Sequence, residues 1–145
     1  MTPIRFGYVG CGFIAQSVHL PNFASLPGCR LEAIAEVRPK LRAQVAAKYG
    51  VAKTYASHME LAADKDIDAV GVSASFVSQA ATALDLLKAG KAVFMEKPMA
   101  VSVAAAEAML AAERAGKGRL MVAYMKRYDA GNELVKAAVD GFRSS

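Results

Sequence analysis

Short apolar runs and longer segments with helical periodicity alternate along the chain. The runs predicted as strands are residues 4–9, 31–35, 54–55, 67–72, 91–95 and 120–123. The segments predicted as helices, with apolar residues recurring every three or four positions, are 12–25, 39–49, 59–63, 77–89, 103–115 and 133–139. Strands and helices alternating at this spacing are typical of βαβ units, whose strands pair in parallel. We therefore expect an α/β fold with a doubly wound parallel sheet covered by helices on both faces.

The composition fits one such domain. The chain has 145 residues, of which 54% are hydrophobic and 21% charged, a balance that argues against disorder. No apolar run approaches the roughly 20 residues that a membrane span requires, so we expect no membrane partner. The first residues run directly into a strand without a signal-peptide pattern, which predicts a cytoplasmic protein.

The net charge of +5 raises the question of a nucleic-acid partner. We expect none, because Lys and Arg are scattered along the chain without a basic stripe or interleaved aromatic residues. Cys11 and Cys29 form neither a CxxC pair nor a zinc-type spacing with His19 and His58. We therefore expect free thiols in a reducing compartment and no metal site.

The first chemical signal is the segment 10–15, GCGFIA, which has the form GxGxxA and connects a predicted strand to a predicted helix. In this context Gly10 permits the tight turn, and Gly12 leaves room for a pyrophosphate beside the backbone. The start of the helix, at Phe13 and Ile14, presents free N–H groups and positive partial charge to the phosphates. The alternative is a turn without a ligand. The strand–GxGxxA–helix order favours dinucleotide binding by a Rossmann fold.

An acidic residue follows at the expected separation. Glu36 lies 24 residues after Gly12, at the end of the second predicted strand, where a carboxylate can accept from both hydroxyls of an adenosine ribose. A carboxylate there repels the 2′-phosphate of NADP, whereas Arg38 can pair with that phosphate. We expect NAD or NADP as the cofactor, with NAD favoured.

The second signal surrounds the fifth predicted strand. Residues 89–98 read AGKAVFMEKP, a string that resembles the AGKxVxxEKP sequence of the glucose-fructose oxidoreductase, inositol dehydrogenase and MocA family. The segment GCGFIA, the acid at Glu36 and the stretch YMKRY at 124–128 occur in the same order and at compatible spacings. The resemblance covers essentially the whole chain. It implies the Rossmann-fold, dinucleotide-binding half of a two-domain oxidoreductase.

The resemblance also implies roles for individual residues. In the family, the lysine that matches Lys97 lies beside the nicotinamide and the reacting carbon, and the peptide before the proline is typically cis. An ammonium there stabilises a developing alkoxide and relays a proton, so Lys97 is the expected catalytic residue. Glu96 and Lys97 are both expected at the cofactor, because ligands gather at the carboxyl ends of the strands. The alternative for this pair is an ion pair on the surface.

Further residues are expected at the cofactor. Ser73 and Ala74 follow the fourth predicted strand and can contact it through backbone atoms. The family often has an arginine near the cofactor at the position of Arg127, for which a solvated position is the alternative. His19 is expected to pack or cap away from the strand ends, and His58 to be solvated.

The sequence differs from the family in two respects. The usual Thr-Pro-Asn-x-x-His is replaced by ASFVSQ at residues 74–79, which removes a proline and a histidine from the nicotinamide side. We expect the second domain of the family, an α+β domain whose Asp and His complete the catalytic group, to be absent or truncated in this chain. We expect a dinucleotide-binding domain at residues 1–124, followed at 125–145 by a linker helix and the start of a truncated second domain.

Two functions follow from these features. The first is the cofactor domain of an oxidoreductase that transfers hydride between NAD(P) and a sugar, polyol or related carbonyl compound. The second is a module that holds the dinucleotide without turnover, as a sensor or scaffold. Glu96 and Lys97 favour the first for a longer parent protein. The segment 74–79 and the expected absence of the second domain favour the second for this chain alone, which we expect to be inactive. The substrate and the assembly state, including a homo-oligomer, stay open.

Overall fold

Six parallel strands form one sheet in residues 2–143, the part of the chain that the computed structural model describes. The strands are β1 Ile4–Val9, β2 Cys29–Ala35, β3 Lys53–Tyr55, β4 Ala69–Val72, β5 Ala92–Met95 and β6 Leu120–Val122. Their order across the sheet is β3-β2-β1-β4-β5-β6. The chain therefore builds outward from β1 to one edge and then returns to build outward to the other. This arrangement confirms the expected doubly wound Rossmann fold.

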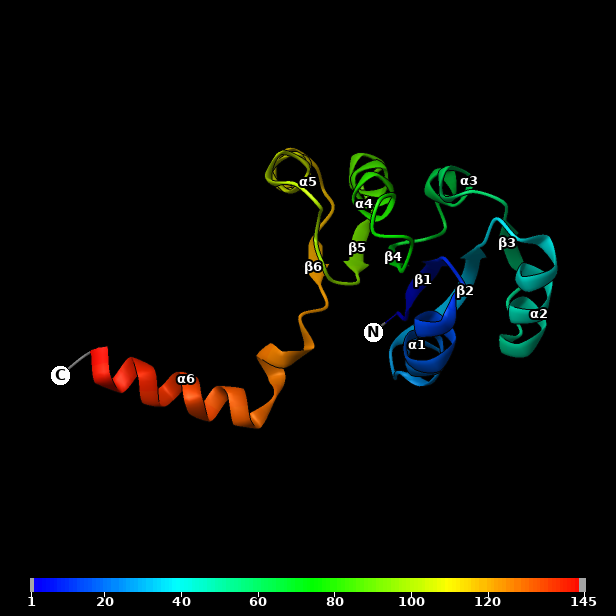
Figure 1. Ribbon diagram of the computed structural model, residues 1–145. Coiled ribbons are helices and arrows are strands. Elements are labelled where there is room, and N and C mark those ends of the chain that lie inside the picture. Colours follow the sequence, from blue (N-terminus) through cyan, green and yellow to red (C-terminus); the bar gives the residue numbers. More distant parts are fainter. Residues whose placement is uncertain (1, 144–145) are drawn as a thin grey trace.

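Helices cover both faces of this sheet. They are η1 Ala15–His19, α1 Leu20–Ser25, α2 Pro39–Tyr49, α3 His58–Ala63, α4 Gln79–Lys88, α5 Val103–Ala115, η2 Met125–Tyr128 and α6 Ala130–Arg143. Figure 1 shows α3, α4 and α5 on one face and α1 and α2 on the other. The point at which the strand order reverses lies between β1 and β4, and loops that meet at such a switch point form a crevice at the carboxyl ends of the strands.

Alternate residues of the strands supply two separate cores. On β1, Phe6 and Tyr8 pack towards α1 and α2, whereas Val9 packs towards the helices of the opposite face. On β4, Val70 and Val72 join that opposite core and are fully buried. Because side chains alternate along a strand, one short apolar run serves both layers, which explains why these strands read as continuous apolar runs.

A row of aligned residues crosses the centre of the sheet on the α1 face. Tyr8 of β1 pairs with Gly71 of β4, which pairs with Phe94 of β5. A Cβ at Gly71 would lie 2.4 Å from Cε2 of Tyr8, so the tyrosine ring occupies the space that any larger residue would need. The missing side chain at Gly71 therefore leaves a gap on β4 that aromatic rings from its neighbours fill.

Lys91 directly precedes β5 and anchors the amino end of this strand. Its ammonium donates hydrogen bonds to the carbonyls of Asp64, at 2.5 Å, and Ile67, at 2.7 Å, in the loop that enters β4. Burial lowers the pKa of this ammonium. The two lysines of the AGKAVFMEKP string thus lie at opposite ends of one strand, and Lys91 serves the fold.

Most predicted elements are present, with shifted ends. The second strand begins earlier than predicted, at Cys29, because residues 29 and 30 continue the pairing with β1. The fourth strand begins later than predicted, at Ala69. The helix α4 also begins later, at Gln79, because residues 75–78 form a turn in which the carbonyl of Ser75 accepts from Gln79 N. The helix α5 begins at the predicted residue, where the side chain of Ser102 accepts from Ala105 N and caps it.

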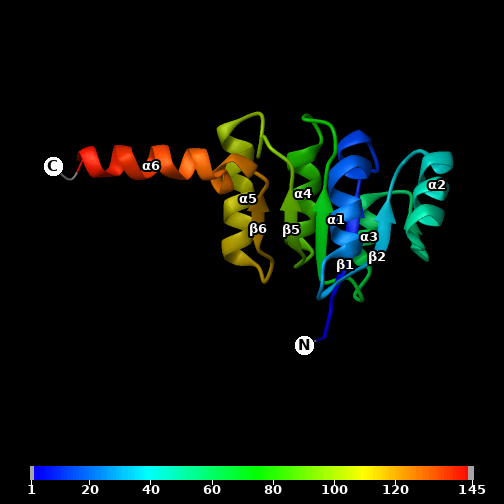
Figure 2. The ribbon, with the colours of Figure 1, turned by 90° about the horizontal axis from the view of Figure 1, so that it is seen from below.

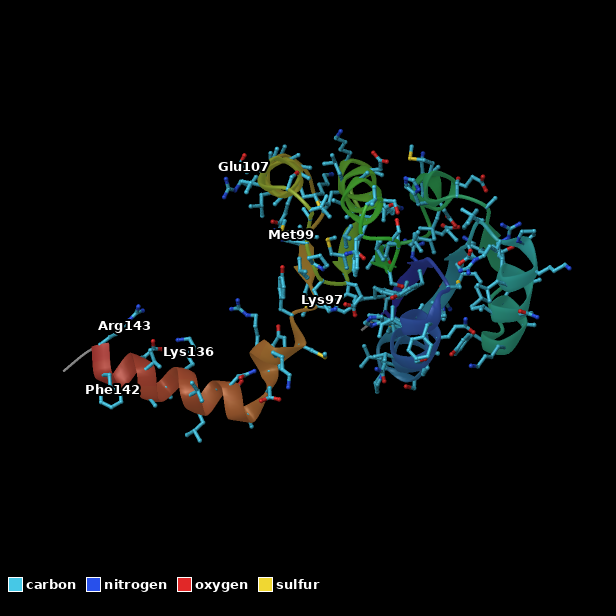
Figure 3. All side chains as sticks on the ribbon, viewed as in Figure 1. Lys97, Met99, Glu107, Lys136, Phe142 and Arg143 are labelled. Atoms are coloured by element: carbon cyan, nitrogen blue, oxygen red, sulfur yellow. The ribbon has the colours of Figure 1, made fainter. Side chains whose placement is uncertain are left out.

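Beyond β6 the chain leaves the sheet. In Figures 1 and 2 the helix α6 extends away from the body, on the side where the strands end. Its residues are exposed, and in Figure 3 Phe142 projects on the side opposite to Lys136 and Arg143. This segment covers most of the predicted linker, of which residues 144–145 lie outside the described part. Among residues 2–143, no helix is both long and apolar enough to cross a membrane.

Candidate functional site

A cleft of about 750 Å³ opens at the carboxyl ends of β1, β2 and β4. It is lined by the residues predicted at the adenosine and phosphates, and by two predicted to contact the cofactor through backbone atoms: Gly10, Gly12, Phe13, Ile14, Glu36 and Arg38, with Ser73 and Ala74. The structure therefore brings together residues from three loops that the sequence placed only by strand order. His58 also lines this cleft; its side chain is partly exposed, and its Nε2 lies 3.1 Å from Asp85.

Positions 10 and 12 of the GCGFIA segment are glycines for different structural reasons. Gly10 has a φ of +85°, and a Cβ there would lie 2.2 Å from the carbonyl oxygen of Ser73. Gly12 has open space around its Cβ position and lines the cleft. Gly10 is therefore required by the close approach of the β1 and β4 loops, whereas Gly12 keeps the cleft empty for a ligand.

A buried hydroxyl chain joins these two loops. The Tyr8 hydroxyl donates to Ser73 Oγ at 3.1 Å, and Ser73 Oγ donates to the carbonyl of Gly10 at 3.3 Å. Burial raises the pKa of Tyr8, which keeps the phenol protonated and able to donate. The glycine turn is thus fixed from the strand below it.

Glu36 is the acidic residue among those that line this cleft, and it is only 4% exposed. Its carboxylate accepts from the backbone N–H of Cys11 at 2.8 Å, and from Nε and Nη2 of Arg38 at 2.8 and 3.0 Å. The side-chain hydrogen bond from Arg38 lowers the pKa of Glu36 to about 2, and the backbone N–H groups of Arg38 and Cys11 act in the same direction. The acid therefore stays ionised, and it ties the glycine turn to the end of β2.

The carboxylate of Glu36 is thus already paired, a point that the sequence did not reveal. Arg38 holds it with two donors but has a side chain that is 61% exposed. Both carboxylate oxygens already accept two hydrogen bonds each, so a ribose diol would reach them only if the exposed guanidinium turned outwards. These groups fit a nicotinamide dinucleotide: a glycine turn, the start of a helix for the phosphates and an ionised acid for the ribose.

A second cleft, of about 660 Å³, adjoins the first one at the ends of β4, β5 and β6. Ile14, Ser73 and Ala74 line both clefts, so the two form one continuous crevice. Lys97 is exposed and lines the second cleft, just beyond the end of β5 (Figure 3). The Lys97–Pro98 peptide is cis, which confirms the expectation from the family.

Glu96 is held by a histidine from the other side of the crevice. Nε2 of His19 lies 2.7 Å from Oε1 of Glu96, and Oε2 of Glu96 accepts from the backbone N–H of Lys97 at 3.1 Å. Glu96 therefore forms no surface ion pair with Lys97, the alternative that the sequence allowed, because its carboxylate turns inwards.

The expectation that His19 lies away from the strand ends is wrong. Its ring stacks on Tyr8 with centroids 5.9 Å apart and meets the edge of Phe94 at 5.4 Å. The gap over Gly71 lets these rings lie side by side across three strands, so His19 reaches the end of β5. The distance along the helix gave no sign of this, because the contact depends on the register of the sheet.

Gln79 is a further residue whose place the sequence did not predict. It is only 2% exposed, and its Nε2 donates to the carbonyls of Glu96 at 2.6 Å and Pro98 at 3.0 Å.

Arg127 lies exposed on η2 and lines neither cleft, although Met125 and Tyr128 of the same turn line the second. A contact of Arg127 with a cofactor stays a prediction.

Known proteins share this fold and its motifs. Inositol 2-dehydrogenase/D-chiro-inositol 3-dehydrogenase of Shouchella clausii is 36% identical over 140 residues, which are 94% of this chain and 40% of that protein. Inositol 2-dehydrogenase of Burkholderia cenocepacia is 34% identical over the same share of the chain and 41% of its own length. The chain thus spans about two fifths of the curated relatives it matches.

Solved structures agree. The 3-ketoreductase KijD10 of Actinomadura kijaniata, in complex with NADP and TDP-benzene, has a TM-score of 0.87 and 29% identity; the match covers 97% of this chain and 44% of that one. The WlbA dehydrogenase of Bordetella pertussis, in complex with NADH and UDP-GlcNAcA, has the same TM-score, 28% identity and coverages of 96% and 42%. Residues 4–124 match the family described as oxidoreductases with an NAD-binding Rossmann fold. The chain therefore belongs to the glucose-fructose oxidoreductase, inositol dehydrogenase and MocA family of oxidoreductases.

Proposed function

We propose that residues 1–124 bind NAD(H) along the crevice, with the adenosine at Glu36 and the nicotinamide beside Lys97. The observation that carries this proposal is the single crevice that joins the glycine turn and ionised acid at one end to the family lysine at the other. The relatives bound to NADP and NADH support a nicotinamide dinucleotide as the class of ligand.

NAD is the favoured form because the Glu36 carboxylate, with its pKa near 2, keeps a full negative charge at the ribose position. A 2′-phosphate would be repelled by this charge at close range. Arg38 could pair with the phosphate only by breaking its hydrogen bonds to Glu36. Calorimetry with NADH and NADPH tests this balance. We expect tighter binding of NADH by the native chain, and a larger preference for it in Arg38→Ala, which removes the partner of the phosphate. Tenfold tighter binding of NADPH would reverse the assignment.

We further propose that the domain serves a longer dehydrogenase acting on a sugar, polyol or related carbonyl compound. When bound, the nicotinamide ring supplies the hydride donor or acceptor. Lys97 lines the second cleft, where its ammonium can donate to the reacting carbonyl oxygen and give a proton to the alkoxide formed on reduction. In the oxidising direction the neutral amine would accept the proton of the hydroxyl group. The names of the relatives, inositol dehydrogenases and a 3-ketoreductase, support this substrate class. The built pocket around Lys97 favours an enzyme over a module that only holds the dinucleotide.

Residues 125–145 would then link this domain to a second one, and the chain by itself would not turn over substrate, because nothing orients the alcohol above the nicotinamide. Absorbance of the reduced nicotinamide, followed with inositols and sugars, tests both statements. We expect turnover only in the longer protein, with kcat lowered about 10² or more in Lys97→Ala. Unchanged kcat in that variant would contradict the catalytic role.

The cellular setting is proposed as cytoplasmic, and a reducing compartment suits both thiols. Cys11 and Cys29 are free, and burial raises the pKa of Cys11 to about 12, with the charge of Glu36 adding to the effect. Cys11 is therefore inert towards oxidation even though it sits in the glycine turn. Assembly into a homo-oligomer is a separate question, which sedimentation of the longer protein would answer.

A further inference from the structure

One buried amide holds the backbone on both sides of Lys97. Nε2 of Gln79, the first residue of α4, donates one hydrogen bond to the carbonyl of Glu96 and one to the carbonyl of Pro98. A side-chain amide nitrogen has two N–H groups, and both are used here. The residue between the two acceptors is Lys97, whose backbone is thereby fixed from the α4 face of the sheet.

The same turn is fixed from the α1 face through Glu96. Its backbone N–H donates to the carbonyl of Val72 at 3.0 Å, and its carboxylate lies between Nε2 of His19 and the N–H of Lys97. Three elements that are distant in the sequence therefore converge on three consecutive residues. These contacts fix the backbone of Lys97, and with it the direction in which the side chain leaves the chain, although the side chain itself is exposed.

We propose that Gln79 is a positioning residue for Lys97, acting through the carbonyls of Glu96 and Pro98 to aim the lysine into the second cleft. This inference rests on the proposed function of Lys97 as the residue that handles the reacting oxygen. Reaction rates depend steeply on placement, and a shift of about 1 Å can lower them by about 10². A side chain that only filled space at position 79 would have no such effect.

Substitutions at Gln79 separate hydrogen bonding from packing. Gln79→Leu keeps a similar volume and removes both donors. Gln79→His restores one ring N–H, which can serve one of the two carbonyls, so it should recover part of what leucine loses. Leu86→Val is the matched control: Leu86 is fully buried on the same helix and makes no hydrogen bond to the turn.

Hydrogen exchange on this chain gives the first test and needs no substrate. In Gln79→Leu we expect the amide of Lys97 to exchange at least tenfold faster, with the amides of β4 unchanged. Gln79→His should lie between leucine and the native residue, and Leu86→Val should leave the Lys97 amide as it is. Equal exchange of the Lys97 amide in the native and Gln79→Leu chains would overturn the proposal.

A double-mutant cycle in the longer enzyme, with NAD⁺ and inositol as probe substrates, gives the second test. We expect Gln79→Leu to lower kcat by about 10- to 100-fold, with the KM for NAD⁺ unchanged. In the Lys97→Ala background the same substitution should have little further effect, because the residue it positions is gone.

The outcomes of the cycle separate the two proposals. An equal loss from Gln79→Leu in both backgrounds would show a general structural role and refute the positioning inference alone. A Lys97→Ala enzyme with native kcat would refute the proposed function of Lys97, while the exchange data would still report whether Gln79 holds the turn.

Discussion

A leucine at Gly12 should abolish dinucleotide binding while the domain stays folded. Gly12 has no atom within 4 Å of its Cβ position, and it lines the first cleft. A Cβ would therefore meet no protein atom, and a leucine side chain would extend from it into the space next to the start of the helix. Gly10→Ala is the matched comparison for stability. Gly10 has a φ of +85°, and a Cβ there would lie 2.2 Å from the carbonyl oxygen of Ser73.

The magnitudes differ for physical reasons. At Gly12 the leucine displaces the pyrophosphate, and losing two charge-assisted hydrogen bonds at about 1.5–3 kcal/mol each weakens binding at least 100-fold. Its effect on folding should stay within about 1 kcal/mol, since a poorer helix start is offset by the lower entropy of the unfolded chain. At Gly10 the left-handed backbone and the overlap with Ser73 together cost about 2–5 kcal/mol.

Calorimetry with NADH and urea unfolding followed by circular dichroism measure the two effects separately. We expect Gly12→Leu to unfold near the native midpoint without detectable heat of binding, and Gly10→Ala to unfold at markedly lower urea. Binding by Gly12→Leu within threefold of the native affinity would refute the assignment of the glycine turn to the phosphates. Equal destabilisation by the two variants would refute the distinction between them.

Three further predictions concern stability. Glu36→Gln removes a carboxylate whose pKa the guanidinium beside it lowers from 4.5 to about 2. Because the pKa is lower in the folded state, Glu36 stabilises the fold above pH 4.5, and this contribution, at most about 3 kcal/mol, is lost as the pH falls towards 2. Urea titrations across that range should show a shallower pH dependence for Glu36→Gln, and an unchanged slope would contradict the pairing. Gly71→Ala should lower the free energy of unfolding by about 1–3 kcal/mol through overlap with Tyr8, and by less in a Tyr8→Leu background. Lys91→Met removes the donor of the buried Ile67 carbonyl and one of the two donors of the Asp64 carbonyl, and should cost about 2 kcal/mol in urea unfolding. NADH affinity should stay unchanged because Lys91 lies at the far end of β5, and weaker NADH binding would refute that separation.

The local features of this chain follow from its sequence. The twofold and 3.6-fold periods of apolar residues predicted the strands and helices, since each depends only on neighbours along the chain. The GxGxxA segment, Glu36 and Lys97 were predicted at the carboxyl ends of strands, and the structure places all of them there. Parallel strands joined by helices bring those ends to one edge, so strand order alone was sufficient.

Contacts across the sheet were decided by the tertiary structure. The hydrogen bond from Cys11 to Glu36, the contact of His19 with Glu96 and the hydrogen bonds from Gln79 to the Lys97 turn depend on where groups from separate elements meet. His19 reaches β5 because Gly71 stands in register between Tyr8 and Phe94, and no period along the chain encodes that register. Loops of different length set the alignment of the strands, and only the packed sheet fixes which residues become neighbours.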